Sequence, residues 1–341
     1  MSGFRMVEGF EDVWRVPVTR RRTPEAVLSP QGDRQAAVRA RLTRLVRRAP
    51  EVMVKVSGRT RDPGHLQAHL DYISRNGALE LEGRDGEVIA GRAEVRDLAD
   101  AWSAMALLDS RHRANSPFSV SIVLSMPAGV DALEVRDAAR AFAREAFANR
   151  FDYVFTLHTD AAHPHVHLSV RALGDQGERL NPKKADLAAW REQFAQALRD
   201  RGVEAEATPR RARGVSRKPE RSSLAHLRRR FEAGQGAPSR AMVGALGEAA
   251  RAAAGTVGAA KPWDVSLARR HDRTRLLYLQ QAALLLASPD AQDRRLGREV
   301  ARFVSQMPGP DTQRLALARE LRRANQTLGL DRPPSTRDRA R

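Results

Sequence analysis

Short segments in the first half of the chain alternate apolar and polar residues, and this period of two predicts β-strands. In EVMVKVSG the alternation stops at Gly58, and in SPFSVSIVLSMPAG it stops at Pro127. A DG turn within ALELEGRDGEVIAG predicts two short strands joined as a hairpin. Strands are expected within residues 51–58, 78–91, 116–129, 153–160 and 163–173.

Between these strands the apolar residues recur every three or four positions, which predicts amphipathic helices. In DPGHLQAHLDYISRNG, for example, Leu66, Leu70 and Ile73 line one face and Gly77 ends the helix. Helices of this kind are expected within residues 33–49, 62–77, 94–108, 131–150 and 185–202. Farther along the chain only helical spacing recurs, in segments 221–232, 238–254, 264–288, 290–307 and 311–328.

This order of elements predicts an α+β protein in which helices flank a central antiparallel sheet, followed by an all-helical C-terminal region. The expected division is a basic N-terminal arm over residues 1–50, the mixed domain over 51–215, the helical region over 216–330 and a basic disordered tail over 331–341. The N-terminus lacks the apolar core of a signal peptide, and LLYLQQAALLLA is too short and too polar to span a bilayer. We therefore expect a cytoplasmic protein without membrane insertion.

The net charge of the chain indicates what kind of partner it binds. A formal net charge of +18 over 341 residues suggests a polyanion, most often nucleic acid or an anionic membrane surface, although a solvated basic face gives the same balance. The chain contains no cysteine, which excludes disulfides, thiolate zinc sites and cysteine nucleophiles.

Four of the nine histidines fall in HTDAAHPHVH, where one predicted strand ends and the next begins, together with Asp160. Alternate residues of a strand share a face, so His158 and Asp160 lie on one face, as do His165 and His167 on the next strand. A hairpin through TDAAHP would bring these side chains together, with His163 in the turn. Imidazole is the commonest ligand of transition metals, so the window predicts a metal site, with Asp160 either orienting a ligand or touching the metal.

A divalent cation in a basic protein suggests phosphodiester chemistry, because the cation can polarise a phosphate oxygen. The attacking group is then either water or a side chain, and without cysteine the three tyrosines are candidates for a covalent mechanism.

Three motifs resemble those of a known family. HTDAAHPHVH, of the form H-x-D-x-x-H-P-H-x-H, resembles the third motif of P-type conjugative relaxases, the HUH-superfamily nickases of mobile plasmids, and is most similar to the T-DNA border endonuclease branch. HLDYISRNGALEL resembles the first motif and IVLSMPAGVD the second, in the family's order and spacing. With RGVEAEATPRRARG the resemblance covers roughly residues 51–215, and it does not extend to the helical region that follows.

The resemblance implies an HUH-type relaxase domain that nicks one strand at an origin of transfer. Tyr72 would attack the scissile phosphate of single-stranded or locally melted DNA, which leaves a 5′-phosphotyrosyl adduct and a free 3′-OH that can be rejoined after transfer. His158, His165 and His167 would hold a divalent metal ion, with Mg or Mn expected and Zn as the alternative. His163 would be accessory, and Asp160 would orient a ligand or take the tyrosine proton.

Further roles carry over less directly. Ser125, in the second motif, either hydrogen-bonds DNA near the nick or is a turn residue at the end of a strand. The cations expected to bind DNA are Arg75, Arg171, Lys183, Lys184, Arg210, Arg211 and Arg213. The implied partners are relaxosome accessory proteins and a type IV secretion coupling protein, and the protein would be exported covalently attached to DNA. The arginine-rich tail resembles an export signal, with a nonspecific DNA clamp as the alternative.

Other functions remain open on the sequence alone. A replication initiator or transposase of the same superfamily usually has its tyrosine after the histidines, whereas Tyr72 precedes them. A non-catalytic DNA-binding scaffold of the relaxosome would not need both Tyr72 and the complete histidine set. A metal-dependent hydrolase that uses water would form no covalent adduct with DNA.

Overall fold

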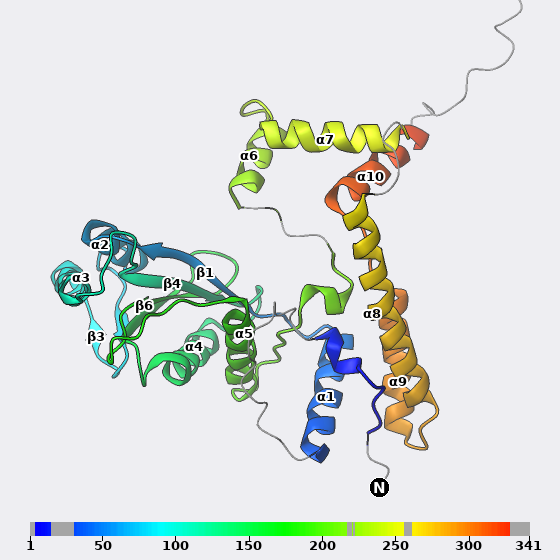
Figure 1. Cartoon of the computed structure of the whole chain (residues 1–341), viewed down its shortest axis with the longest axis horizontal. Coiled ribbons are helices and arrows are strands. Elements are labelled where there is room, and N and C mark those ends of the chain that lie inside the picture. The colour runs from blue at the N-terminus through cyan, green and yellow to red at the C-terminus, as the bar shows by residue number, and fades with distance from the viewer. Residues whose placement is uncertain (1–3, 15–30, 217–219, 221, 256–260, 328–341) are drawn as a thin grey trace, which may run out of the picture. The chain divides into compact units, whose positions relative to one another are not determined.

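The structure, a computed structural model, describes residues 4–14, 31–216, 220, 222–255 and 261–327 (Figure 1). The chain forms two compact units, of which one is Arg15–Thr208 and the other combines Met1–Trp14 with Pro209–Arg341. The tail expected at 331–341 lies outside the described residues, and the domain boundaries expected near residues 50 and 215 stay predictions.

The unit formed by residues 15–208 is built on a six-stranded sheet in which every strand pair is antiparallel. The order across the sheet is β1-β4-β6-β5-β2-β3, so β1 and β3 are the edge strands. The expected α+β class with a central antiparallel sheet is confirmed. The strands are β1 (Met53–Thr60), β2 (Leu81–Gly83), β3 (Val88–Ile89), β4 (Ser119–Ser125), β5 (Tyr153–His158) and β6 (His165–Arg171).

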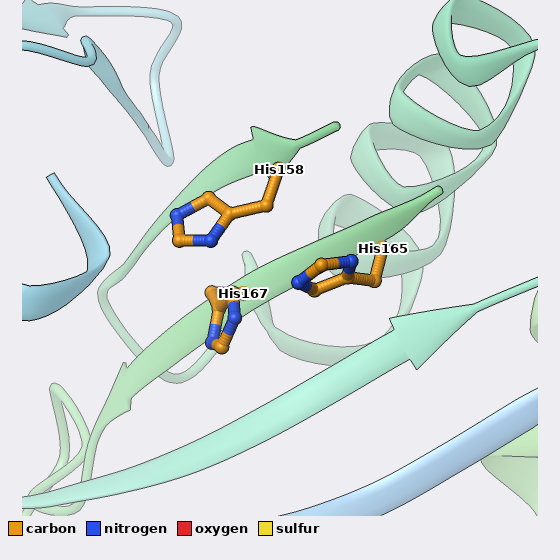
Figure 2. A group of neighbouring side chains, drawn as sticks. All are labelled: His158, His165 and His167. Atoms are coloured by element: carbon orange, nitrogen blue, oxygen red, sulfur yellow. The ribbon is translucent and has the colours of Figure 1, made fainter. Parts of the chain in front are cut away.

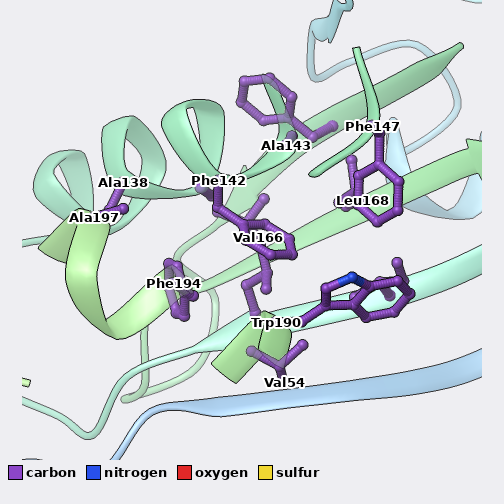
Figure 3. Packing of buried hydrophobic residues seen from close by; sticks show 14 of the residues in the cluster. Val54, Ala138, Phe142, Ala143, Phe147, Val166, Leu168, Trp190, Phe194 and Ala197 are labelled. Carbon is purple, nitrogen blue, oxygen red and sulfur yellow. The ribbon is translucent and has the colours of Figure 1, made fainter. Parts of the chain in front are cut away.

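One face of the sheet carries the main hydrophobic core (Figure 3). Alternate residues such as Ile122 of β4 and Leu168 of β6 point to this face and are almost completely buried. The helices α4 (Ala132–Phe147) and α5 (Lys184–Arg199) cover it, with Phe142 and Phe194 packed edge to face at 6.2 Å between ring centroids. Asp131 begins α4 by accepting a hydrogen bond from the main-chain N–H of Leu133, which satisfies one of the unpaired donors of the first turn.

The other face is partly covered by α2 (Pro63–Ile73) and α3 (Gly91–Leu108), which lie on the opposite side of the sheet from α4 and α5 (Figure 1). A second core joins Leu66, Leu70 and Ile73 of α2 to Trp102 of α3. The three α2 residues are those whose spacing predicted the buried face of this helix. Because these two helices cover only part of the face, the remainder is free to carry polar side chains.

A further helix, α1 (Gln31–Val46), belongs to the same unit. Arg44 binds the carboxylate of Glu206 at 2.9 Å, and Arg41 lies 3.5 Å from the same carboxylate. Glu206 is fully buried and pairs by a parallel bridge with Glu51, just before β1. These two arginines offset the free-energy cost of burying the Glu206 carboxylate, and they hold α1 next to the start of β1.

The second unit is helical, as expected. The N-terminal segment with the 3₁₀-helix η1 (Phe10–Val13) packs on α8, where the side-chain amide of Gln281 accepts from Val7 N and donates to Arg5 O, both at 2.9 Å. Phe10 packs edge to face on Tyr278 at 5.4 Å. Among the described residues, no helix combines the length and apolar character needed to cross a bilayer. The other elements of this unit are η2 (Arg210–Arg213), α6 (Ser222–Glu232), α7 (Arg240–Ala253), α8 (Pro262–Leu286), α9 (Ala291–Ser305) and α10 (Gln313–Thr327).

Candidate active site

Three histidines converge on the open part of the sheet face (Figure 2). The register places His158 of β5 directly opposite His165 of β6, and His167 lies opposite Thr156 on the same face. The ring centroids of His158 and His167 are 4.4 Å apart, and one nitrogen from each of the three rings lies within 4.8 Å of the others. The hairpin geometry expected from strand alternation is therefore present, and it brings together a three-nitrogen group.

Two main-chain carbonyls set which ring nitrogen is available in two of these histidines, His158 and His165. His158 Nε2 donates to Ile73 O at 2.7 Å, which leaves Nδ1 as the nitrogen with a lone pair. His165 Nδ1 donates to His163 O at 3.0 Å, which leaves Nε2. Hydrogen bonds of this kind fix the tautomer and the ring orientation of metal-binding histidines.

The electrostatic environment favours neutral imidazoles, which are the form that binds metals. Burial, reinforced by the neighbouring His158 and His165, lowers the pKa of His167 to about 3. Burial also lowers the pKa of His158 from its usual range. Three imidazole nitrogen donors on neighbouring strands fit a transition-metal ion with open coordination positions.

Tyr72 lies in the last turn of α2, next to this cluster. Its ring centroid is 5.7 Å from that of His167 and 6.4 Å from that of His158, and the side chain is 55% exposed. The Tyr72 ring therefore contacts the histidine group and is also open to a macromolecular substrate. The other two tyrosines, Tyr153 and Tyr278, are buried in the separate cores of the two units.

The chain reverses direction immediately after α2 through three consecutive left-handed residues, Arg75, Asn76 and Gly77, with φ values of 53°, 57° and 81°. A Cβ at Gly77 would lie 2.5 Å from the main-chain carbon of Gly91, so only glycine fits there. The Ser74 hydroxyl accepts a hydrogen bond from Gly77 N at 3.0 Å, which closes the turn. This turn explains the S-R-N-G sequence and aims the Arg75 side chain back at the histidines.

The Arg75 side chain contacts three other residues of the site. Its guanidinium forms an ion pair with Asp160, lies 5.6 Å from the Tyr72 ring centroid, and donates from Nη2 to His158 Nδ1 at 3.4 Å. Because His158 Nδ1 has a single lone pair, this last contact and a metal–nitrogen bond exclude each other. A bound cation would therefore displace Arg75 from His158.

The remaining motif residues lie beside the cluster. Ser125 of β4 is opposite His165 on the same face, and its buried hydroxyl donates to Met126 O at 3.3 Å. The His163 side chain is exposed and is not part of the three-nitrogen group, but its carbonyl orients His165. Asp160 contacts Arg75 and not a histidine.

Most of the other cations expected to bind DNA are not brought to the cluster. Lys183 and Lys184 are exposed at the start of α5, a helix on the opposite face of the sheet. Arg171 ends β6 six residues from His165, about 20 Å along the strand, where it is buried and bound to Leu173 O and Asp175. The three arginines of η2, Arg210, Arg211 and Arg213, belong to the helical unit, and burial lowers the pKa of Arg211. Their DNA-binding roles stay predictions.

Sequence reasoning missed one polar pair under α2. His69 lies one turn before Tyr72, and its Nε2 is hydrogen-bonded to the Ser121 hydroxyl of β4 at 2.9 Å. Burial, with a smaller contribution from His65, lowers the pKa of His69 to about 4. The available signals were the i,i+3 spacing to Tyr72 and the shared strand parity of Ser121 and Ser125.

Comparison with known families agrees with this geometry. Residues 72–203 match the family described as "Relaxase: MobA/VirD2-like, nuclease domain", and this segment includes Tyr72 and all three histidines. The chain contains a relaxase nuclease domain. The expected resemblance to relaxases related to the T-DNA border endonuclease is thereby confirmed.

Named relatives match about half of this chain. The chain is 26% identical over 187 residues to the T-DNA border endonuclease VirD2 of Rhizobium radiobacter, an alignment that covers 50% of this chain and 44% of the relative. The protein of the same name from Agrobacterium fabrum is 25% identical over 187 residues, with 42% of it covered. The chain thus spans less than half the length of these relatives.

Among solved structures, one titled "Molecular Basis of Vancomycin Resistance Transfer in Staphylococcus aureus" aligns with 47% of this chain and 99% of its own, at 15% identity and a TM-score of 0.32. A TM-score this low adds nothing to the assignment of the relaxase domain.

Proposed function

We propose that this protein is a conjugative DNA relaxase that nicks one strand at an origin of transfer with Tyr72 as the nucleophile. The observation that carries the proposal is the position of an exposed tyrosine 5.7 Å, between ring centroids, from a histidine of a three-nitrogen group. The relaxase family of the domain supports the same reaction class.

The donor set supports metal dependence and narrows the choice of ion. A divalent cation held by His158, His165 and His167 would polarise an oxygen of the scissile phosphate and offset the charge that develops during attack. Imidazole nitrogen suits transition metals such as Zn, whereas Mg prefers oxygen ligands. Among the ions expected from the sequence, we therefore favour a transition metal, Mn or Zn, over Mg.

The chain's own groups account for the covalent step. Tyr72 Oη forms a bond to phosphorus as the bond to the 3′ oxygen breaks, which leaves a 5′-phosphotyrosyl adduct and, after protonation, a 3′-OH. The Tyr72 phenol must lose its proton during attack, and the exposed carboxylate of Asp160, the ion-pair partner of Arg75, is the acceptor that we assign. The reverse reaction restores the phosphodiester, so the same residues serve rejoining after transfer.

Arg75 is placed to act on the phosphate and on the nucleophile. Its guanidinium lies beside the Tyr72 ring, and its planar fork matches two phosphate oxygens. A cation held by His158 Nδ1 would occupy the lone pair that Arg75 contacts, which would leave the guanidinium, still paired with Asp160, to bind the substrate phosphate. Ser125, beside His165, supplies a hydroxyl to DNA near the nick.

The biological setting follows from this activity as part of the proposal. The substrate is single-stranded or locally melted origin DNA, the partners are accessory proteins of the relaxosome and a type IV coupling protein, and the protein leaves the cytoplasm attached to DNA. Replication initiation or transposition is the related alternative, and a non-catalytic scaffold is the alternative from another class.

The test is incubation of the full chain with a scanning set of labelled origin oligonucleotides and Mn, followed by denaturing electrophoresis. A nick together with a denaturation-resistant protein–DNA adduct is expected, and peptide mapping should place DNA on Tyr72. A nick without an adduct would indicate hydrolysis by water. An adduct on Tyr153 or Tyr278 would overturn the assignment of the nucleophile.

A further inference from the structure

We propose that the DNA strand crosses β4 on one side of the scissile phosphate and that Lys55, on the edge strand β1, binds its backbone there. The inference rests on the proposed relaxase function and adds a binding position to it. It follows from the strand register together with the exposure and pairing of Lys55.

Two rows of residues connect β1 to the histidines across the open face. Lys55 is opposite Val123, which is opposite His167, and Met53 is opposite Ser125, which is opposite His165. All of these side chains point away from the core that Val54 and Leu124 enter. At about 4.8 Å per strand spacing, Lys55 starts about 10 Å from His167. A backbone phosphate near the metal site and one near Lys55 can therefore belong to the same short stretch of DNA.

Lys55 is free to take up an anion. It is exposed, and within the described parts of the chain it makes no ion pair or hydrogen bond. The nearby Arg75, in contrast, is held by Asp160 in this structure. The exposed thioether of Met53 lies in the next row, and it offers a soft apolar surface on which a base can rest. Between β1 and the histidines, the proposed DNA path crosses the β4 residues Val123 and Ser125. Both are buried and neither is acidic.

A competing explanation assigns Lys55 to protection of the sheet edge, because lysines on edge strands discourage pairing with other chains. The two explanations differ in what removal of the charge does to DNA binding. Edge protection concerns aggregation and leaves the salt dependence of DNA affinity unchanged. A phosphate contact contributes to that dependence through counterion release.

The experiment measures the affinity of the full chain for a fluorescein-labelled oligothymidine at several salt concentrations. In Lys55→Ala the slope of log affinity against log salt should become shallower by about 0.7, the value for one contact on single-stranded DNA. Lys55→Arg should restore the slope. The matched control is Arg59→Ala on the same strand, because Arg59 pairs with Val120 and therefore belongs to the opposite face. An unchanged slope in Lys55→Ala, or an equal change in Arg59→Ala, would overturn the proposal.

A second measurement locates the contact relative to the nick. Origin oligonucleotides that the wild type nicks are shortened from the 5′ or the 3′ end. Lys55→Ala should bind as tightly as the wild type when the oligonucleotide is shortened on the side that contacts Lys55, and more weakly when it is shortened on the other side. A defect that persists with every shortened substrate would contradict a local contact. Failure of the proposed function would appear differently, as no Tyr72 adduct in the wild type.

Discussion

His158 Nε2 donates a hydrogen bond to the carbonyl oxygen of Ile73 over 2.7 Å, and this bond joins a candidate metal ligand to the helix that carries Tyr72. Ile73 is the last residue of α2 and follows Tyr72 directly. The same bond fixes the tautomer of His158, so its available nitrogen faces the other two histidines. One contact therefore links the orientation of this candidate ligand to the helix that carries the proposed nucleophile.

The three-histidine geometry predicts unequal effects of the histidines on metal binding. His165→Ala or His167→Ala removes one of three nitrogen donors and should weaken Mn affinity by about tenfold or more, with most nicking lost. His163→Ala should lose much less, because His163 orients His165 through its main-chain carbonyl, which the substitution keeps. Titration calorimetry with Mn checks the ranking, and equal losses at all three positions would show that His163 is also a ligand.

Two substitutions at Arg75, in the left-handed turn after α2, distinguish the role of its side chain in nicking from the effect of its backbone conformation on stability. Arg75→Ala and Arg75→Gly should reduce nicking alike, since both remove the guanidinium beside Tyr72 and Asp160. The Gly variant should be the more stable of the two by about 1 kcal/mol, because φ at this position is 53°. Urea unfolding and single-turnover nicking measure the two effects. Full activity in either variant would remove Arg75 from the proposed mechanism.

The buried His69 predicts a dependence of stability on pH. The pKa of His69 in the folded protein is about 4, below the unfolded value of about 6.5. The unfolded chain therefore binds more protons on His69 between these values, so the contribution of His69 to stability is intact above pH about 6.5 and is lost progressively as the pH falls toward 4.

His69→Gln keeps a polar partner for Ser121 without a titrating group, so the fall in stability with pH should be shallower. Urea unfolding of the chelator-treated protein at a series of pH values tests this. His226→Gln, which changes an exposed histidine of α6, is the control and should leave the slope as in the wild type. A slope unchanged by His69→Gln would mean that other groups carry the pH dependence.

The division into two units predicts which truncation retains activity. A fragment of residues 31–208 contains the whole sheet, the histidine group and α1, and it should nick an origin oligonucleotide without supporting transfer between cells. A fragment that ends at 215 but keeps the N-terminus leaves Phe10 without Tyr278 and should be more prone to aggregate. Light scattering and nicking of both fragments check this. Loss of nicking in the 31–208 fragment alone would show that the helical unit contributes to the site.

The sequence by itself determined the parts of this site that depend on local geometry. Side chains alternate along a strand whatever surrounds it, so the spacing of His165 and His167 was enough to place both on one face of their strand. The apolar spacing of α2 likewise identified its buried face, because a helix repeats every 3.6 residues. The motif order was enough to single out Tyr72 among three tyrosines.

Only the tertiary structure decided the contacts between distant segments. Strand parity placed Arg171 on the histidine face but could not show that it lies at the far end of β6, bound to Asp175. The pairing of Arg75 with Asp160 joins the turn after α2 to the end of β5, and the row from Lys55 to His167 depends on the register of strands that are far apart in the sequence. A register shift between Val56 and Gly58 then decides which face the later residues of β1 occupy. The packing of Phe10 on Tyr278 joins residues more than 250 positions apart, for which no local pattern exists. Register and long-range packing follow from the burial of the whole core, so they cannot be read from the spacing of residues within one segment.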